Sequence, residues 1–355
     1  MKILDRYLGA IILQYTMVVM MVLLGLFTFV TFLDQLGSIG KGSYDLFQAI
    51  SFVILIIPRT IYELFPMAAL LGTIIGLSML ANDSELIVMR ASGVSMVQIT
   101  SAALKMGGIF VVAAILMGEL VSPYTETAAH RNRAEALQED IKQHTNFGLW
   151  MRDSETYVNI GEVLPDLTLL RVLVYEFDPE RQLRSLVRAK RGQFQGDYWL
   201  LQKVRQTLVE PDGKIERRTT KAAKWESRVN PQILSVFLIK PDQLSFLQLS
   251  KYIGHLNDNQ QKTDPYELAF WSKIMLPLST AVMVILAIPF VFTNVRSGTL
   301  GRNLFIGIML GIGFYVANKG FGYIVLANGL SPLLGATIPV IAFLILALIM
   351  IRRIE

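Results

Sequence analysis

LGAIILQYTMVVMMVLLGLFTFVTFL, residues 8–33, runs for 26 residues without a charged side chain. A helix needs about 20 mostly apolar residues to cross the hydrocarbon core of a bilayer. Five further stretches are equally free of charge, at residues 64–81, 106–118, 274–295, 303–318 and 320–351. A long, strongly charged segment separates the first three stretches from the last three. The pattern predicts an α-helical polytopic membrane protein with three spans, one large extramembrane domain and three more spans.

The predicted spans divide the chain into three parts. The spans are expected at about residues 8–33, 47–81, 98–121, 268–292, 302–327 and 333–351. The parts are then residues 1–123, 124–265 and 266–355. Arg59 and Glu63 in the second span are four residues apart, on one helix face, where they can pair. Two glycine pairs have the spacing that permits close helix contacts, Gly72 with Gly76 and Gly307 with Gly311.

The composition agrees with a membrane-embedded chain. Of the 355 residues, 53% are hydrophobic and 17% are charged, less charge than a soluble domain carries. The net charge of +5 favours an anionic partner, and the embedded spans make lipid the expected partner rather than nucleic acid. The chain has no cysteine, which excludes disulfide and thiol chemistry.

Basic residues in the short loops predict the orientation. Eight lie on one side of the membrane, namely Lys2, Arg6, Arg90, Lys105, Arg296, Arg302, Arg352 and Arg353. The short loops on the opposite side offer little beyond Lys41. Because cytoplasmic loops are enriched in Lys and Arg, both termini are expected in the cytoplasm and the large domain outside.

The segment between the two groups of spans changes from helical to strand-like patterning. Residues 125–138 predict a polar helix that extends the third span outward. Three later runs, at 157–160, 170–177 and 202–209, alternate roughly and are rich in β-branched or aromatic residues. Turn signals follow at 178–179, 196–197 and 211–213. Short strands with such turns predict a β-sandwich or jelly roll. Residues 244–256 predict a short amphipathic helix that returns to the membrane.

No catalytic chemistry is recognisable. His130, His144 and His255 lack metal-ligand spacing, and no Gly-x-Ser-x-Gly elbow occurs. The chain is therefore expected to be no enzyme by itself and to bind no cofactor. If ATP drives it, another chain hydrolyses the ATP.

Residues 82–93, NDSELIVMRASG, predict a short helix on the cytoplasmic side. Capping residues precede Glu85 in the first turn, and Gly93 suits the helix end. Apolar side chains exposed there need a partner, and those expected to be exposed are Leu86, Ile87 and Met89. The alternative is a helix that lies on the lipid headgroups.

Several motifs resemble those of the YjgP/YjgQ (LptF/LptG) permease family, the LptG branch more than the LptF branch. They are LDRY (4–7), DQL (34–36), GSYD (42–45), FPMAALLG (65–72), SEL (84–86), Met89, ASG (91–93) and WSK (271–273). The resemblance covers the whole chain and its layout. It implies a permease subunit of an ABC transporter that extracts lipopolysaccharide from the outer leaflet of a Gram-negative inner membrane. It also implies a periplasmic β-jellyroll in the middle part.

The resemblance further implies partners. These are an LptF-like permease in a heterodimer, two copies of an LptB-like ATPase that uses ATP and Mg, the single-span LptC and an LptA-like periplasmic bridge. The resemblance implies that residues 82–93 form the helix that couples to the ATPase, through Glu85, Leu86, Met89 and Arg90. Two other classes compete, an integral membrane enzyme and a scaffold, each acting on an envelope lipid through the outward domain. The missing nucleophile argues against an enzyme. A lysine within a span, Lys319, is costly and would not be needed in a scaffold that only anchors the outward domain.

Spans one and five are expected to form a lipid-binding wall. Lys319 is costly against lipid tails, so it should face a cavity or a partner. The wall residues on the two helix faces are Tyr315, Ile312, Ile308 and Phe305 with Asp34, Thr31, Phe27, Leu24 and Met20. The alternative is that the apolar ones merely contact acyl tails or neighbouring helices.

Lys41 and Lys319 are expected to hold lipid phosphates. Family members often carry several basic residues after span one, whereas only Lys41 follows here. The alternative for Lys41 is a solvated loop charge. The alternative for Lys319 is an ion pair with a carboxylate on another span, with Asp34 as the candidate.

Overall fold

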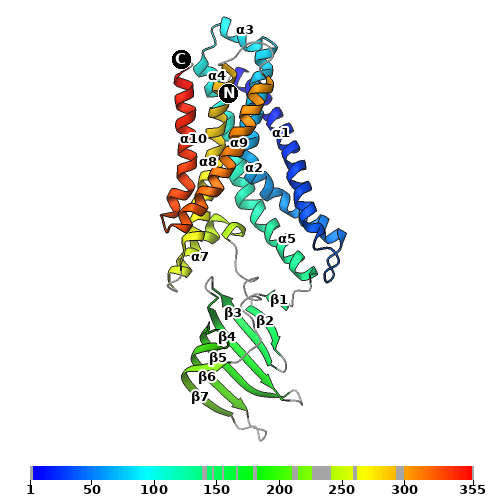
Figure 1. Ribbon diagram of the computed structural model, residues 1–355, viewed down its shortest axis with the longest axis vertical. Helices are drawn as coiled ribbons and strands as arrows, with labels where there is room; N and C mark the ends of the chain where they lie inside the picture. Colours follow the sequence, from blue (N-terminus) through cyan, green and yellow to red (C-terminus); the bar gives the residue numbers. More distant parts are fainter. Residues whose placement is uncertain are drawn as a thin grey trace.

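The computed structural model describes residues 3–137, 142–145, 148–153, 156–164, 167–178, 182–209, 215–225, 241–258, 262–292 and 300–353. The turn expected at 211–213 and Arg296 lie outside these residues. Figure 1 shows a helical bundle with both chain ends and α3 (Glu85–Ala91) at one end, and a β-domain beyond the other. We call these the α3 end and the β-domain end.

Within the described ranges, six helical segments are long and apolar enough to cross a membrane. The helices that form them are α1 (Ile3–Leu36), α2 (Leu46–Asn82), α4 (Met96–Leu116), α8 (Asp264–Phe292), α9 (Leu300–Ala327) and α10 (Pro332–Arg352). The third span continues from α4 through a π-helical turn, η1 (Met117–Val121), into α5 (Ser122–Ala136). The predicted three-plus-three layout and the polar outward extension of span three are confirmed.

α2 is the centre of the bundle and packs against α1, α5, α8 and α9. Its small residues Ala68, Ala69 and Gly72 are buried, which lets neighbouring backbones approach. A side chain added at Gly72 would overlap the backbone of Thr16 on α1. Gly307 on α9 lies instead against side chains of α2. Both predicted glycine pairs therefore lie at helix contacts.

The β-domain is inserted between α5 and α8, as predicted. Its strands are β1 (Lys142–Thr145), β2 (Gly148–Asp153), β3 (Thr156–Val163), β4 (Leu169–Phe177), β5 (Leu183–Phe194), β6 (Trp199–Val209) and β7 (Ile215–Trp225). They form one antiparallel sheet in sequence order. Trp199, fully buried, packs with Ile160 and Val172 in the core of this sheet. The topology among the described strands is thus an up-and-down meander, without the crossovers of a jelly roll.

The amphipathic helix α7 (Phe246–Asp258) joins the sheet to the bundle, after a short 3-10 turn, η3 (Pro241–Gln243). Leu249 and Leu256 pack with Leu164, which follows β3, and with Tyr266 on α8. The returning helix expected at 244–256 is therefore confirmed, and it docks the β-domain onto α8.

Candidate functional site

Arg59 on α2 is the centre of an ion-pair network at the β-domain end. Its Nε lies 3.3 Å from Oε1 of Glu63, so the predicted pair forms. The same guanidinium pairs with Glu126 on α5 and, at 3.0 Å, with Asp242 in η3. Glu126 is only 1% exposed. Its carboxylate depends mainly on Arg59, because its other cationic neighbour, His130 with Nε2 at 3.9 Å, is charged only when protonated.

Lys319 on α9 joins this network through Glu63. Its Nζ lies 3.3 Å from Glu63 Oε1. The prediction that Asp34 pairs with Lys319 is wrong. Asp34 is exposed near the end of α1, and α2 packs between α1 and α9. The carboxylate that reaches Lys319 therefore comes from α2 rather than from α1.

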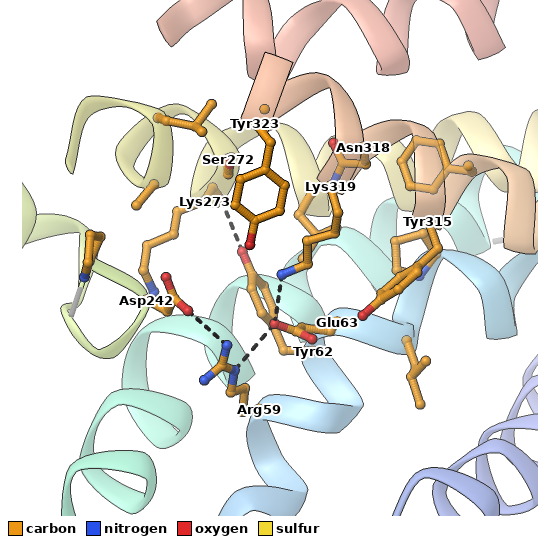
Figure 2. A pocket seen from close by; sticks show the side chains of 18 of the residues that line it. Arg59, Tyr62, Glu63, Asp242, Ser272, Lys273, Tyr315, Asn318, Lys319 and Tyr323 are labelled. Carbon is orange, nitrogen blue, oxygen red and sulfur yellow. Dashed lines mark hydrogen bonds and ion pairs between the residues drawn. The ribbon is translucent and has the colours of Figure 1, made fainter. Parts of the chain in front are cut away.

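The Glu63–Lys319 pair lies between two cavities. Cavity A, about 320 Å³, is bounded mainly by α2, α8 and α9. Cavity B, about 260 Å³, is bounded by α1, α2, α5 and α9. Figure 2 shows the Lys319 and Arg59 side chains meeting at Glu63 beside cavity A. Because Arg59, Glu63, Leu64 and Tyr315 line both cavities, these residues form the partition between them.

The residues predicted for the lipid wall come together in part. Phe27 and Thr31 line cavity B with Tyr315, and Lys319 lines cavity A. Three more share a hydrophobic cluster with α2 residues, namely Met20, Leu24 and Ile308. Two project from the bundle, Phe305 and Ile312. The structure thus brings α1 and α9 to one region but inserts α2 between them, an arrangement that the pattern of neither span indicates.

Lys41 is exposed in the loop between α1 and α2, and this loop is fastened to α5. The Ser43 N–H donates to a carbonyl at the end of α5 at 2.7 Å. Arg133 on α5 donates from Nε to Gln35 Oε1 at 3.0 Å. The Tyr44 phenol also donates to Gln35, and burial raises the pKa of this phenol, which keeps the donor protonated. The loop carrying Lys41 is therefore fixed to the helix that leads into the β-domain.

A second polar cluster surrounds η1. Lys273 on α8 donates from Nζ to the Gly118 carbonyl at 3.2 Å, and its Nζ lies 3.4 Å from Glu119. Glu119 also accepts the N–H of Phe246, at the start of α7, at 2.7 Å. π-helical turns interrupt the regular ladder and often occur at functional sites. Here the turn anchors α8 and α7 to the third span.

Sequence reasoning missed three acids of these networks, Glu119, Glu126 and Asp242. Glu126 and Asp242 lie 67 and 183 residues from Arg59 in the chain, so no local spacing indicates their contacts. Lys273 appeared only within a family motif. In the part of the chain that the structure describes, no group of three His, Asp or Glu side chains is arranged to hold a metal ion.

At the α3 end, the short helix α3 differs from its prediction in its exposed face. Leu86 is buried in the bundle and Met89 packs against the same cluster, whereas Ile87 and Val88 are exposed. The expectation that Leu86 is exposed is therefore wrong. Glu85 accepts a hydrogen bond from the Tyr7 phenol at 2.6 Å.

The ends of α3 also differ from each other. Ser84 at the N-cap has φ +62° and makes no capping bond with its side chain, so the expected cap is absent at that residue. Gly93, with φ +90°, ends the segment as predicted. Arg90 is exposed beside the two apolar residues.

Comparison with known proteins matches residues 6–353 to the family described as lipopolysaccharide export system permease LptF/LptG. The lipopolysaccharide export system permease protein LptG of Escherichia coli K12 is 35% identical over 353 residues, 99% of this chain and 98% of that protein. The LptG protein of Haemophilus influenzae is 35% identical over 345 residues, 97% of this chain and 96% of that protein.

Proposed function

The chain belongs to the LptF/LptG family of lipopolysaccharide export system permeases, and we propose that it extracts lipopolysaccharide from the outer leaflet of a bacterial inner membrane and passes it toward a periplasmic bridge. One observation carries the proposal beyond family membership. Among the membrane spans, cavities A and B meet at Arg59 and Glu63, and Lys319 lines cavity A beside them. A partly apolar cavity with cations suits a phosphorylated amphiphile.

The proposed orientation puts the α3 end in the cytoplasm and the β-domain in the periplasm. It is supported by Arg90 on α3 and by Arg6, Lys105 and Arg302, which lie in the parts of α1, α4 and α9 nearest the α3 end. The chain works in a heterodimer with an LptF-like permease. Two LptB-like ATPases hydrolyse ATP with Mg in trans, an LptC-like protein joins them, and an LptA-like bridge receives the lipid.

The exposed face of α3 is the proposed ATPase contact. Ile87 and Val88 offer apolar surface, with Glu85 and Arg90 as flanking charges. Leu86 and Met89 support this face from within the bundle. Co-purification with the ATPase and ATP-dependent release of lipopolysaccharide from proteoliposomes test the function. Lipid modification without ATP would instead indicate an envelope-lipid enzyme.

Glu85→Ala is expected to abolish transport and to weaken association with the ATPase. Tyr7→Phe is the matched control, because it removes the internal hydrogen bond of Glu85 and keeps the carboxylate. Normal transport by normally expressed Glu85→Ala would overturn the coupling role. Equal losses in both variants would show that the acid serves α1 rather than the ATPase.

The proposed lipid wall is tested with photo-crosslinking residues at Leu24 and Ile312. Ile341, exposed on α10, is the control position. Lipopolysaccharide should be captured from the first two sites and not from Ile341. Capture only from Ile341 would contradict the wall.

Phosphate contact is tested by Lys41→Glu, Lys319→Glu and the double variant. Lys319 is 47% exposed, so its ammonium has donors left beyond Glu63. The double variant should bind lipopolysaccharide least, and unchanged binding would refute both contacts. Recovery of Lys319→Glu by Glu63→Lys would assign the lysine to an internal ion pair instead.

A further inference from the structure

Cavity A lies where two neighbouring spans pack poorly. α9 packs chiefly against α2 and α10 and makes little contact with α8. The cavity, about 320 Å³, fills the resulting gap, and ligand pockets begin near 300 Å³. Along α9 its lining runs from Gly311 to Leu326, roughly 22 Å at the rise of an α-helix. Half the hydrocarbon core is about 15 Å, so the cavity reaches from mid-membrane to the headgroup level.

The lining changes character along this length. The deep end is apolar, with Met67, Leu276 and Phe314. Toward the β-domain end the polar residues Lys273 and Lys319 come next, and beyond them lies Tyr323, 72% exposed, a tyrosine of the type found at membrane interfaces. An amphiphile from the leaflet on the β-domain side matches this order, with a chain at the deep end and a head at the polar end.

The charged residues at the polar end of cavity A determine which lipid headgroup fits there. Lys319, 47% exposed, and Asp242, 56% exposed, are its two accessible charges of opposite sign, and Arg59 with Glu63 lies between them. The charged residues that line cavity A are three cations, Arg59, Lys273 and Lys319, and two carboxylates, Glu63 and Asp242. A purely anionic head can pair with Lys319 but faces the exposed carboxylate of Asp242, whereas a zwitterion satisfies both accessible charges.

We propose that cavity A binds a phospholipid with a primary-ammonium head, phosphatidylethanolamine. Its phosphate accepts from Lys319 and its ammonium donates to Asp242. One acyl chain lies between α8 and α9, and the other remains in the bilayer. The proposal does not depend on lipopolysaccharide transport, but the two lipids would share Lys319 as a donor to phosphate and would compete for it.

The test uses the full chain in phosphatidylcholine nanodiscs that contain a small share of phosphatidylethanolamine with a diazirine on one acyl chain. After irradiation, peptide mass spectrometry should find label at Met67, Leu276 or Phe314. Matched phosphatidylglycerol and phosphatidylcholine probes should label these residues about tenfold less, since each loses one charge-assisted contact. Equal labelling by all three probes, no label at the deep residues, or protection by lipopolysaccharide but not by unlabelled phosphatidylethanolamine would overturn the proposal.

Variants separate the cavity from the bulk bilayer. Leu276→Trp should fill the deep end and abolish its labelling, while Met309→Trp, on the exposed face of the same α9, should not. Asp242→Asn should remove the preference for the ethanolamine head and keep labelling by phosphatidylcholine. Asp258→Asn, exposed on α7, is its control. A full preference in Asp242→Asn refutes the ammonium contact even if Leu276→Trp fails to fold.

Discussion

α2 and α9 line the same two cavities but are held in the bundle by different means. In its most apolar window α2 is 72% buried, against 17% for α9. α2 contacts α1 through backbone at Gly72 and carries the central cation Arg59. α9 contacts α2 through flexible side chains at Gly307 and through the Glu63–Lys319 pair.

The difference indicates which helix moves. A helix fixed by backbone contacts and a buried network cannot shift without breaking them, whereas flexible side chains and a half-exposed ion pair can rearrange. We therefore expect α2 to remain the fixed partition and α9 to be the mobile wall of both cavities. Substitutions that remove or alter one of these contacts at a time test this difference between α2 and α9.

Arg59→Ala should give the largest effect. It leaves the buried Glu126 with only His130 as a cationic neighbour, a loss of up to about 3–5 kcal/mol for a broken buried pair. The expected readout is a clearly lower midpoint of thermal unfolding in detergent, with faster proteolysis near η3. Arg59→Leu combined with Glu126→Leu should recover much of the midpoint. A double variant as unstable as Arg59→Ala would show that packing around Arg59, and not the ion pairs, stabilises this part of the bundle.

Gly72→Ala should follow, at about 1–3 kcal/mol of overpacking. The new methyl group meets Thr16 backbone, so α1 must move away from α2. Thermal unfolding again measures the cost. Thr16→Gly cannot relieve a clash with backbone atoms, and recovery by that second change would contradict the close backbone contact.

The membrane spans could be predicted because the bilayer fixes the length and apolarity of a crossing helix. The sheet was harder. β3, β4 and β6 were found by alternation, but β7, IERRTTKAAKW, is exposed along nearly its whole length and has no buried face to impose a pattern. β5 carries charged residues at several positions, which hides its buried Ser185 and Ala189.

The site was predictable only where contacts are local. Arg59 and Glu63 are one helical turn apart, so their spacing in the sequence predicted the ion pair. Asp34 was preferred for Lys319 because it was the acid assigned to the same wall, and the position of α2 between the two helices could not be read from either span. The burial of Leu86 likewise depends on how α3 folds back onto the bundle.

Lys319→Met should have a smaller effect on stability, about 1 kcal/mol or less, because the Glu63–Lys319 pair is half exposed. Its effect on motion should be greater. Spin labels at Tyr323 and at Ala269 on α8 should report a broader distance distribution when α9 loses this tie. Arg302→Met, which removes an exposed charge from the other end of α9, is the control. An unchanged distribution in Lys319→Met would mean that packing against α2 and α10 positions α9 without the ion pair.

Gly307→Ala should have the smallest effect and completes the comparison with Gly72→Ala. The added methyl group would lie 2.7 Å from Ile74 Cδ1 and 3.0 Å from Leu71 Cδ2, both at the ends of flexible side chains on α2. Those ends can turn aside, and alanine favours the helix over glycine by up to about 1 kcal/mol, so the two terms nearly cancel. The unfolding midpoint should stay close to that of the unmodified chain. A loss as large as that of Gly72→Ala would show that α9 is fixed to α2 as rigidly as α1 is, and the mobile-wall interpretation would then fail.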